Sequence, residues 1–264
     1  MKDGSADMHF KIKLVFSDEL VCFLQKKPKS NEVFCKIDRK RSIKDIIESK
    51  GVPHTETGRI IVNGKDVDFH YIPEGPQTIG VVHAIPPFDV TAPTVLRPSP
   101  FPEIRFIVDV NVGKLAQLLR IIGINTLYSN SYSDREVADL AETDKRIVLT
   151  KDRGLLKRTK VVFGRHIRSI NPYDQLTEVI GFYGLKGPFT LFAICLQCNV
   201  PLCHVEKQQI LHRLRPKTKK YYSLFFSCPK CEKIYWKGTH HDHIAKRLIS
   251  LGVNMAEAQR PFFT

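Results

Sequence analysis

The sequence has no run of about 18 apolar residues, the length that a membrane-spanning helix needs, so we expect no contact with a membrane. It has no collagen repeat or long low-complexity tract, and 42% of its 264 residues are hydrophobic, which excludes a fibrous or wholly disordered chain. Its first nine residues are too polar for a secretory signal, so we expect a reducing, cytoplasmic location. Seven cysteines are an odd number for a disulfide framework. Four of them stand in two Cys-x-x-Cys pairs, which favours metal binding over cross-links.

Positive charge is in excess and unevenly spread. The chain has 41 Lys and Arg against 27 Asp and Glu, a formal net charge of +14. Residues 195–264 hold 12 basic and 4 acidic side chains, more than half of that surplus. A local excess of this kind favours contact with a polyanion such as nucleic acid, although a solvated basic surface has the same composition.

Six prolines between residues 86 and 103 predict a stiff linker, because proline fixes φ and favours extended neighbours. Before it, residues 9–16 alternate as a strand, residues 32–37 form a second strand, and Ser42 can cap a helix that ends at Gly51. A strand at 60–62 then runs into an Asn-Gly turn. This order resembles a β-grasp, ubiquitin-like domain. It lacks a terminal Gly-Gly for conjugation, so we interpret it as a module that binds or scaffolds a protein partner.

Short apolar strands alternate with amphipathic helices after the linker, which predicts an α/β domain with a mostly parallel sheet. The predicted strands cover residues 105–110, 125–128, 146–150 and 167–170. Three helices are predicted. The first ends at Gly123, the second begins at a capping box formed by Ser133 and Glu136, and the third begins at Pro172. The chain therefore divides into a β-grasp domain (8–85), a linker (86–103), a parallel-sheet domain (104–190), a cysteine-bearing domain (191–250) and a tail (251–264).

Three aspartates stand near the ends of these strands. Asp109 ends the first, Asp152 follows the third, and Asp134 opens the helix after the second. Parallel strands end at one edge of a sheet, so we expect the three carboxylates to converge there, around a Mg²⁺ or Mn²⁺ ion suited to phosphodiester cleavage. Structural alternatives stay open, because Asp134 also suits a helix N-terminus and Asp152 a turn. Asp174 is a possible fourth acid.

The strongest local signal is a pair of Cys-x-x-Cys motifs separated by 29 residues. Two such knuckles can complete a closed tetrahedral zinc site with a structural role. The predicted zinc ligands are Cys195, Cys198, Cys228 and Cys231. Cys203 or His204 could replace one of them, whereas Cys22 and Cys35 fall in predicted strands as core thiols.

Cations and aromatic residues lie between and after the knuckles. Five cations are followed by two tyrosines, a composition that suits phosphate contact and base stacking, although a solvated hairpin loop is an alternative. A strand is predicted at 221–226. Trp236 suits core packing and base stacking equally, and the histidines near 240 suit a phosphate contact or a helix start. The predicted nucleic-acid contacts are Arg213, Arg215, Lys217, Lys219, Lys220, Tyr221, Trp236, Lys237 and His240.

Three motifs point to one family. Phe106-Ile-Val-Asp-Val-Asn-Val-Gly-Lys-Leu-Ala-Gln-Leu-Leu-Arg-Ile-Ile-Gly123, Ser133-Asp-Arg-Glu-Val-Ala-Asp-Leu-Ala141 and Arg146-Ile-Val-Leu-Thr-Lys-Asp-Arg-Gly-Leu155 resemble motifs of the Mut7-C ribonuclease family. That family is similar to PIN-fold nucleases and typically ends in a zinc ribbon, and some members begin with a ubiquitin-like domain. The resemblance implies that Asp109, Asp134 and Asp152 bind metal. One departure is Gln117-Leu118, where the family usually has Arg-Trp.

We therefore expect a Mg²⁺- or Mn²⁺-dependent ribonuclease with a PIN-like domain, an N-terminal β-grasp domain and a C-terminal zinc ribbon that helps to bind RNA. The alternative is a non-catalytic RNA-binding adaptor on a ribonucleoprotein particle, which uses the same basic ribbon. A receiver-like phosphotransfer domain fits less well. Such a domain needs an adjacent acidic pair and a lysine at the end of a late strand, and neither is evident in this sequence.

Overall fold

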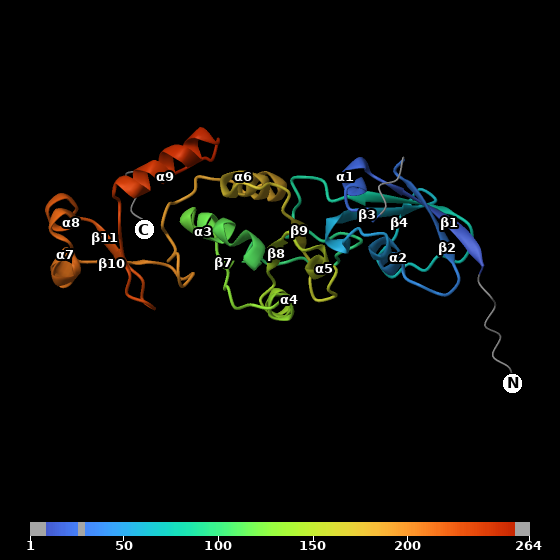
Figure 1. The fold of residues 1–264 in the computed structure, drawn as a ribbon, viewed down its shortest axis with the longest axis horizontal. Helices are drawn as coiled ribbons and strands as arrows, with labels where there is room; N and C mark the ends of the chain where they lie inside the picture. Colours follow the sequence, from blue (N-terminus) through green and yellow to red (C-terminus); the bar gives the residue numbers. More distant parts are fainter. Residues whose placement is uncertain (1–8, 26–29, 257–264) are drawn as a thin grey trace. The chain divides into compact units, whose positions relative to one another are not determined.

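The computed structural model describes residues 9–25 and 30–256, drawn as a coloured ribbon in Figure 1. The chain forms two compact units. The first unit joins residues up to 104 with the segment 133–166, and the second joins residues 105–132 with those from 167 onward. Within the described ranges, no helix has the length and apolar character that crossing a bilayer requires. The α/β class and the N-terminal β-grasp sheet are as predicted, whereas the proposed domain boundaries stay predictions. Tail residues 257–264 lie outside the described part.

The first unit begins with a five-stranded sheet in the order β2-β1-β5-β3-β4. Strand β1 pairs in parallel with β5 and antiparallel with β2, as in a β-grasp fold. Alternate residues of β1 point inward onto the buried face of helix α2, whose first turn is capped by Ser42 as predicted. Asn63 and Gly64, both with positive φ, make the predicted tight turn. The elements are β1 (Phe10–Phe16), α1 (Asp18–Val21), β2 (Glu32–Ile37), α2 (Ile43–Ser49), the 3₁₀ helix η1 (His54–Glu56), β3 (Thr57–Val62), β4 (Lys65–Asp66) and β5 (Thr78–His83).

The proline-rich segment has no helix or strand, as proline predicts, yet it is packed rather than free. Leu96 joins the hydrophobic core of the β-grasp domain. The guanidinium of Arg97 is buried and donates to the carbonyls of His54, Thr57 and Val162 at 2.8, 3.0 and 3.1 Å. Three aromatic rings surround the same guanidinium, which further fixes it. The segment therefore fastens parts of the first unit together.

The rest of the first unit comes from the predicted α/β domain. Helix α4 (Asp134–Thr143) begins with the predicted capping box of Ser133 and Glu136. Strand β8 (Ile147–Thr150) pairs in parallel with β9 (Gly164–His166), and the short helix α5 (Arg153–Leu156) lies between them in sequence. The strand predicted at 167–170 is wrong. Ile170 is 88% exposed, and the pairing falls on the preceding residues instead.

The second unit starts with the buried strand β6 (Phe106–Val108), which pairs in parallel with β7 (Thr126–Leu127). The 3₁₀ helix η2 (Val110–Val112) and helix α3 (Gly113–Ile121) connect them. Helix α3 ends before Gly123, whose φ of +85° lies in the left-handed region that favours glycine. Helix α6 (Pro172–Tyr183) begins at the predicted proline and packs against α3.

The cysteine-bearing part of the second unit is a three-stranded antiparallel sheet in the order β10-β11-β12. One of its predicted features was wrong, because the strand predicted at 221–226 begins only at Phe225. Residues 216–221 form a helix, so the hairpin loop that the sequence left open as an alternative is not formed there. The elements are β10 (Cys203–Val205), α7 (Lys207–Ile210), η3 (Leu211–Arg213), α8 (Pro216–Tyr221), β11 (Phe225–Ser227), β12 (Ile234–Trp236) and α9 (Thr239–Ser250).

Candidate metal centres and nucleic-acid interface

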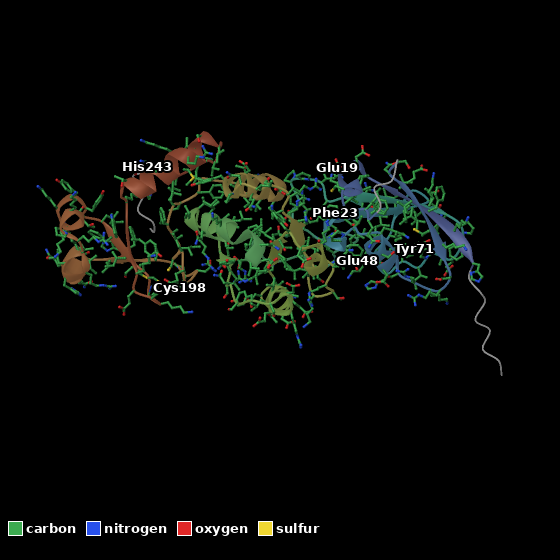
Figure 2. The ribbon with its side chains drawn as sticks, viewed as in Figure 1. Glu19, Phe23, Glu48, Tyr71, Cys198 and His243 are labelled. Carbon is green, nitrogen blue, oxygen red and sulfur yellow. The ribbon has the colours of Figure 1, made fainter. Side chains whose placement is uncertain are left out.

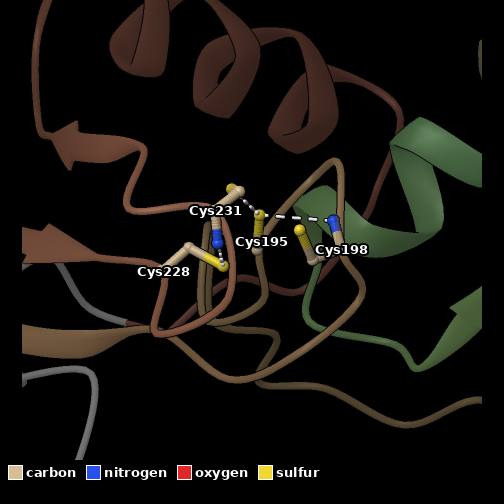
Figure 3. A group of neighbouring side chains, drawn as sticks. All are labelled: Cys195, Cys198, Cys228 and Cys231. Atoms are coloured by element: carbon tan, nitrogen blue, oxygen red, sulfur yellow. Dashed lines mark hydrogen bonds between the residues drawn. The ribbon is translucent and has the colours of Figure 1, made fainter.

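The four predicted zinc ligands come together, as Figure 3 shows. Their Sγ atoms all lie within 4.8 Å of one another, and those of Cys195 and Cys231 are 3.7 Å apart. A tetrahedral site with Zn–S bonds of about 2.3 Å separates its sulfurs by about 3.8 Å, so the cluster has the right size for one zinc ion. Four sulfur ligands leave no open coordination position, which fits a structural site. Cys203 is exposed and stands outside the cluster.

The two knuckles have the same backbone geometry. In the first, the Asn199 N–H donates to the Cys195 carbonyl at 2.9 Å. In the second, the Glu232 N–H donates to the Cys228 carbonyl at 2.8 Å. Asn199 and Glu232 both have φ of 56°, in the left-handed region, and each follows its second cysteine directly. The repeated turn is what brings both sulfurs of a Cys-x-x-Cys motif to one side.

The pKa values of two thiols in the cluster, Cys195 and Cys198, are shifted in opposite directions. Burial raises the pKa of Cys195, but hydrogen bonds from the Tyr235 hydroxyl and from nearby backbone N–H groups outweigh it and lower the pKa to about 6. Burial and hydrogen bonds with Cys231 and Cys228, together with the charge on Cys195, raise the pKa of Cys198 to about 12. One thiolate therefore suppresses another, and a divalent ion removes that conflict.

Cys22 and Cys35, both predicted to be core thiols, differ in their surroundings. Cys35 is a buried core thiol in β2, as predicted. The prediction for Cys22 was wrong, because this residue is exposed and follows the short helix α1 instead of lying in a strand.

The first knuckle is fastened to the α/β part of the second unit by residues that the sequence analysis missed. Arg120 of α3 is buried and donates to the carbonyls of Leu196 and Thr126 at 2.7 and 2.8 Å. The Asn199 side chain accepts from the Thr126 N–H at 2.8 Å and donates to the Asn125 side chain at 2.9 Å. Asn after a Cys-x-x-Cys motif was a usable signal, since Asn tolerates positive φ. The role of Arg120 has no local signal.

The predicted basic segment forms the surface of helix α8. Thr218 faces inward, while the basic residues of the helix are exposed and Tyr221 is 67% exposed. Arg213, the last residue of η3, also donates to the Glu232 carbonyl at 2.7 Å and so bonds the segment before α8 to the second knuckle. The exposed cations of this segment are Arg213, Arg215, Lys217, Lys219 and Lys220. A row of exposed cations ending in an exposed aromatic ring is a surface that can hold phosphates and stack a base.

The remaining predicted contacts lie on β12 and after it. Trp236 is 40% exposed, and its ring centroid is 6.5 Å from that of Tyr222. It therefore packs on one side and leaves part of its ring open. Lys237 is half-buried, and His240 lies in the first turn of α9, with its side chain outside the described part.

Asp109 lies in the second unit, directly after β6, and is only 5% exposed. Its two carboxylate oxygens accept from the Val110 N–H at 2.6 Å and from the Asn111 side-chain amide at 2.5 Å. These bonds hold the carboxylate in one orientation at the strand end. A carboxylate that is almost buried beside an apolar strand needs such partners or a cation.

Asp134 and Asp152 lie in the first unit. Asp134 is the first residue of α4, and its carboxylate is 3.7 Å from the Arg158 guanidinium with both side chains well exposed. Asp152 caps α5, since its Oδ1 accepts from the Gly154 N–H at 2.6 Å, and its own N–H donates to Thr150 at 2.8 Å. Both residues thus have a structural role. Their convergence with Asp109 stays a prediction.

Comparisons with known proteins agree with this architecture. The sequence matches the Mut7-C RNAse domain over residues 104–248 and the Mut7-C ubiquitin domain over residues 9–88. No curated protein and no solved structure matches the chain.

Proposed function

The chain belongs to the Mut7-C RNAse family, and we propose that it is a metal-dependent ribonuclease that hydrolyses RNA phosphodiester bonds. Family membership indicates an RNA-related, nuclease-type function. The observation that carries the finer proposal is Asp109, a nearly buried and doubly hydrogen-bonded carboxylate at the end of a buried strand inside the matched region. Carboxylate oxygen is the ligand that Mg²⁺ and Mn²⁺ prefer, and a carboxylate held in one orientation at a strand end is suited to bind such an ion.

In this proposal Asp109, Asp134 and Asp152 bind Mg²⁺ or Mn²⁺, hard cations that prefer carboxylate oxygens. Such an ion supplies Lewis acidity toward a phosphate and lowers the pKa of bound water. The other residues of the chain hold the metal-binding carboxylates in place. The N–H of Val110 and the amide of Asn111 orient Asp109, and the backbone of α5 orients Asp152.

RNA binding falls to the ribbon. The cations of α8 neutralise phosphates, and Tyr221 with the open part of Trp236 offers faces on which bases stack. Zinc in the four-cysteine cluster stabilises the ribbon, including the second knuckle to which Arg213, shortly before α8, is bonded. Because the four thiols must stay reduced to bind zinc, we place the protein in a reducing compartment such as the cytoplasm.

The test is cleavage of single-stranded RNA with and without Mn²⁺ or Mg²⁺, with Asp152→Asn as the variant. We expect cleavage that needs the ion, that the variant loses, and RNA binding that the variant keeps. The matched control is Asp139→Asn, an exposed aspartate of α4 that pairs with Lys160 at 2.8 Å. RNA binding without any turnover in the wild type contradicts the proposal and favours an RNA-binding adaptor.

A further inference from the structure

Both ends of helix α5 are bonded to the β-grasp domain within the first unit. At the first residue, Arg153 donates to the carbonyls of Cys22 and Phe23 at 3.1 and 3.2 Å. Its guanidinium carbon also lies 5.0 Å from the centre of the Phe23 ring. Just after the last residue, the Lys157 ammonium donates to the Glu48 carbonyl at 2.8 Å, at the negative end of helix α2. Phe23 and Glu48 are labelled in Figure 2.

The chain that follows α5 is bonded to the same domain. His54 Nε2 lies 2.8 Å from the Val161 carbonyl. The Glu56 carboxylate, 1% exposed, accepts from the Arg165 guanidinium at 2.6 Å and from the His166 N–H at 2.7 Å. On the β-grasp side, all of these bonds are made by backbone carbonyls or by buried side chains. They leave the segment from 153 to 166 little freedom to move away.

Asp152 is the residue directly before Arg153, so its carboxylate depends on this anchorage. It is oriented by the first turn of α5 through the Gly154 N–H. Helix α5 has four residues, far below the about 12 at which an isolated helix begins to hold itself together. The turn is therefore kept in place by bonds from outside, and Arg153 makes the pair closest to Asp152.

We propose that the ubiquitin-like domain is an intramolecular partner of the RNase domain and that Arg153 is a positioning residue, which holds the turn that presents Asp152. This inference rests on the proposed role of Asp152 as a metal ligand. The inference gives the ubiquitin-like domain a role in positioning Asp152 within the proposed metal site. A module that only recruits another protein needs no such bonds to the segment after Asp152.

The experiment compares full-length wild type with Arg153→Ala, Arg153→Lys and a control, Lys160→Ala. Lys160 lies in the same segment and carries the same charge, but it pairs with Asp139 and Glu142 of α4. Two quantities are measured: amide hydrogen exchange over residues 153–157, and the affinity for Mn²⁺ alone.

We expect exchange about tenfold faster in Arg153→Ala, since charge-assisted hydrogen bonds and a cation–π contact are lost together. Mn²⁺ affinity should fall about tenfold, as is usual when a group that orients a metal ligand is removed. Arg153→Lys should recover part of both effects, because its ammonium stays near the Phe23 ring and one carbonyl. The control should stay within about twofold of wild type.

Unchanged exchange and unchanged Mn²⁺ affinity in Arg153→Ala overturn the inference, as do equal effects in Lys160→Ala. If the wild type binds no Mn²⁺ and cleaves no RNA, the proposed function fails. In that case, amide hydrogen exchange over residues 153–157 still tests whether the ubiquitin-like domain holds the first turn of α5. Faster exchange confined to Arg153→Ala supports a domain that holds the turn, and unchanged exchange overturns it.

Discussion

Replacing Glu56 by alanine should destabilise the first unit by about 3–5 kcal/mol, the usual cost of removing one partner of a buried ion pair. The Glu56 side chain is 1% exposed and that of Arg165 is 12% exposed, so little water can replace the lost carboxylate. The substitution also removes the acceptor of the His166 N–H on strand β9. Small domains are stable by about 5–15 kcal/mol, so the expected loss is a large share of the total.

The assay is urea unfolding followed by far-ultraviolet circular dichroism, with Asp66→Ala as the matched control. The carboxylate of Asp66 pairs with Arg59 at 3.0 Å, but both side chains are well exposed, and removing such a pair costs less than about 1 kcal/mol. A shift in the urea midpoint for Glu56→Ala alone agrees with a buried bond between β-grasp domain and β9. Equal shifts in the two variants, or a loss below about 1 kcal/mol for Glu56→Ala, refute the reasoning.

Three further outcomes are expected. Removing zinc with a chelator should shift the fluorescence of Trp236, the sole tryptophan, because its strand β12 pairs with β11 and the second knuckle connects the two; an unchanged spectrum with zinc gone contradicts the structural role. Arg120→Ala should cost about 1–3 kcal/mol in urea unfolding, since it leaves carbonyls of the first knuckle without their donor. Alanine at the three lysines of α8 should lower the slope of log affinity for single-stranded RNA against log salt by about 2, while alanine at three exposed lysines of the β-grasp sheet (Lys11, Lys36 and Lys65) should leave it unchanged.

Features whose cause is local could be predicted from the sequence. Ser42 and Ser133 cap their helices as their spacing predicts, and the Asn63-Gly64 turn follows from the two residue types. The four-cysteine cluster belongs here too. A Cys-x-x-Cys motif contains its own turn, and two such motifs in one domain can share one metal ion.

Features whose cause is distant could not be predicted in this way. Strand β9 carries Arg165 and His166, which look like surface residues, but their polar groups bond to Glu56, more than 100 residues earlier. Ile170 was expected in a strand and is 88% exposed. Helix α8 is a different case: Pro216 at its first position was a local signal for a helix start, and the sequence analysis did not use it.

For the acidic site, the sequence predicts only that acidic residues stand near the ends of strands. Asp109 and Asp152 stand where parallel strands end, and their local hydrogen bonds fix how each carboxylate is turned. Their meeting with Asp134 depends on packing between parts of the chain that the sequence does not encode locally.

The central claim is tested most directly by a crystal structure of the protein soaked in Mn²⁺, with the ion located by its anomalous scattering. The proposal predicts manganese bonded to carboxylate oxygens of Asp109 and Asp152, with Asp134 in the same coordination sphere or reaching it through water. Manganese that is absent from these carboxylates, or the three side chains on separate surfaces, contradicts the proposed hydrolytic site.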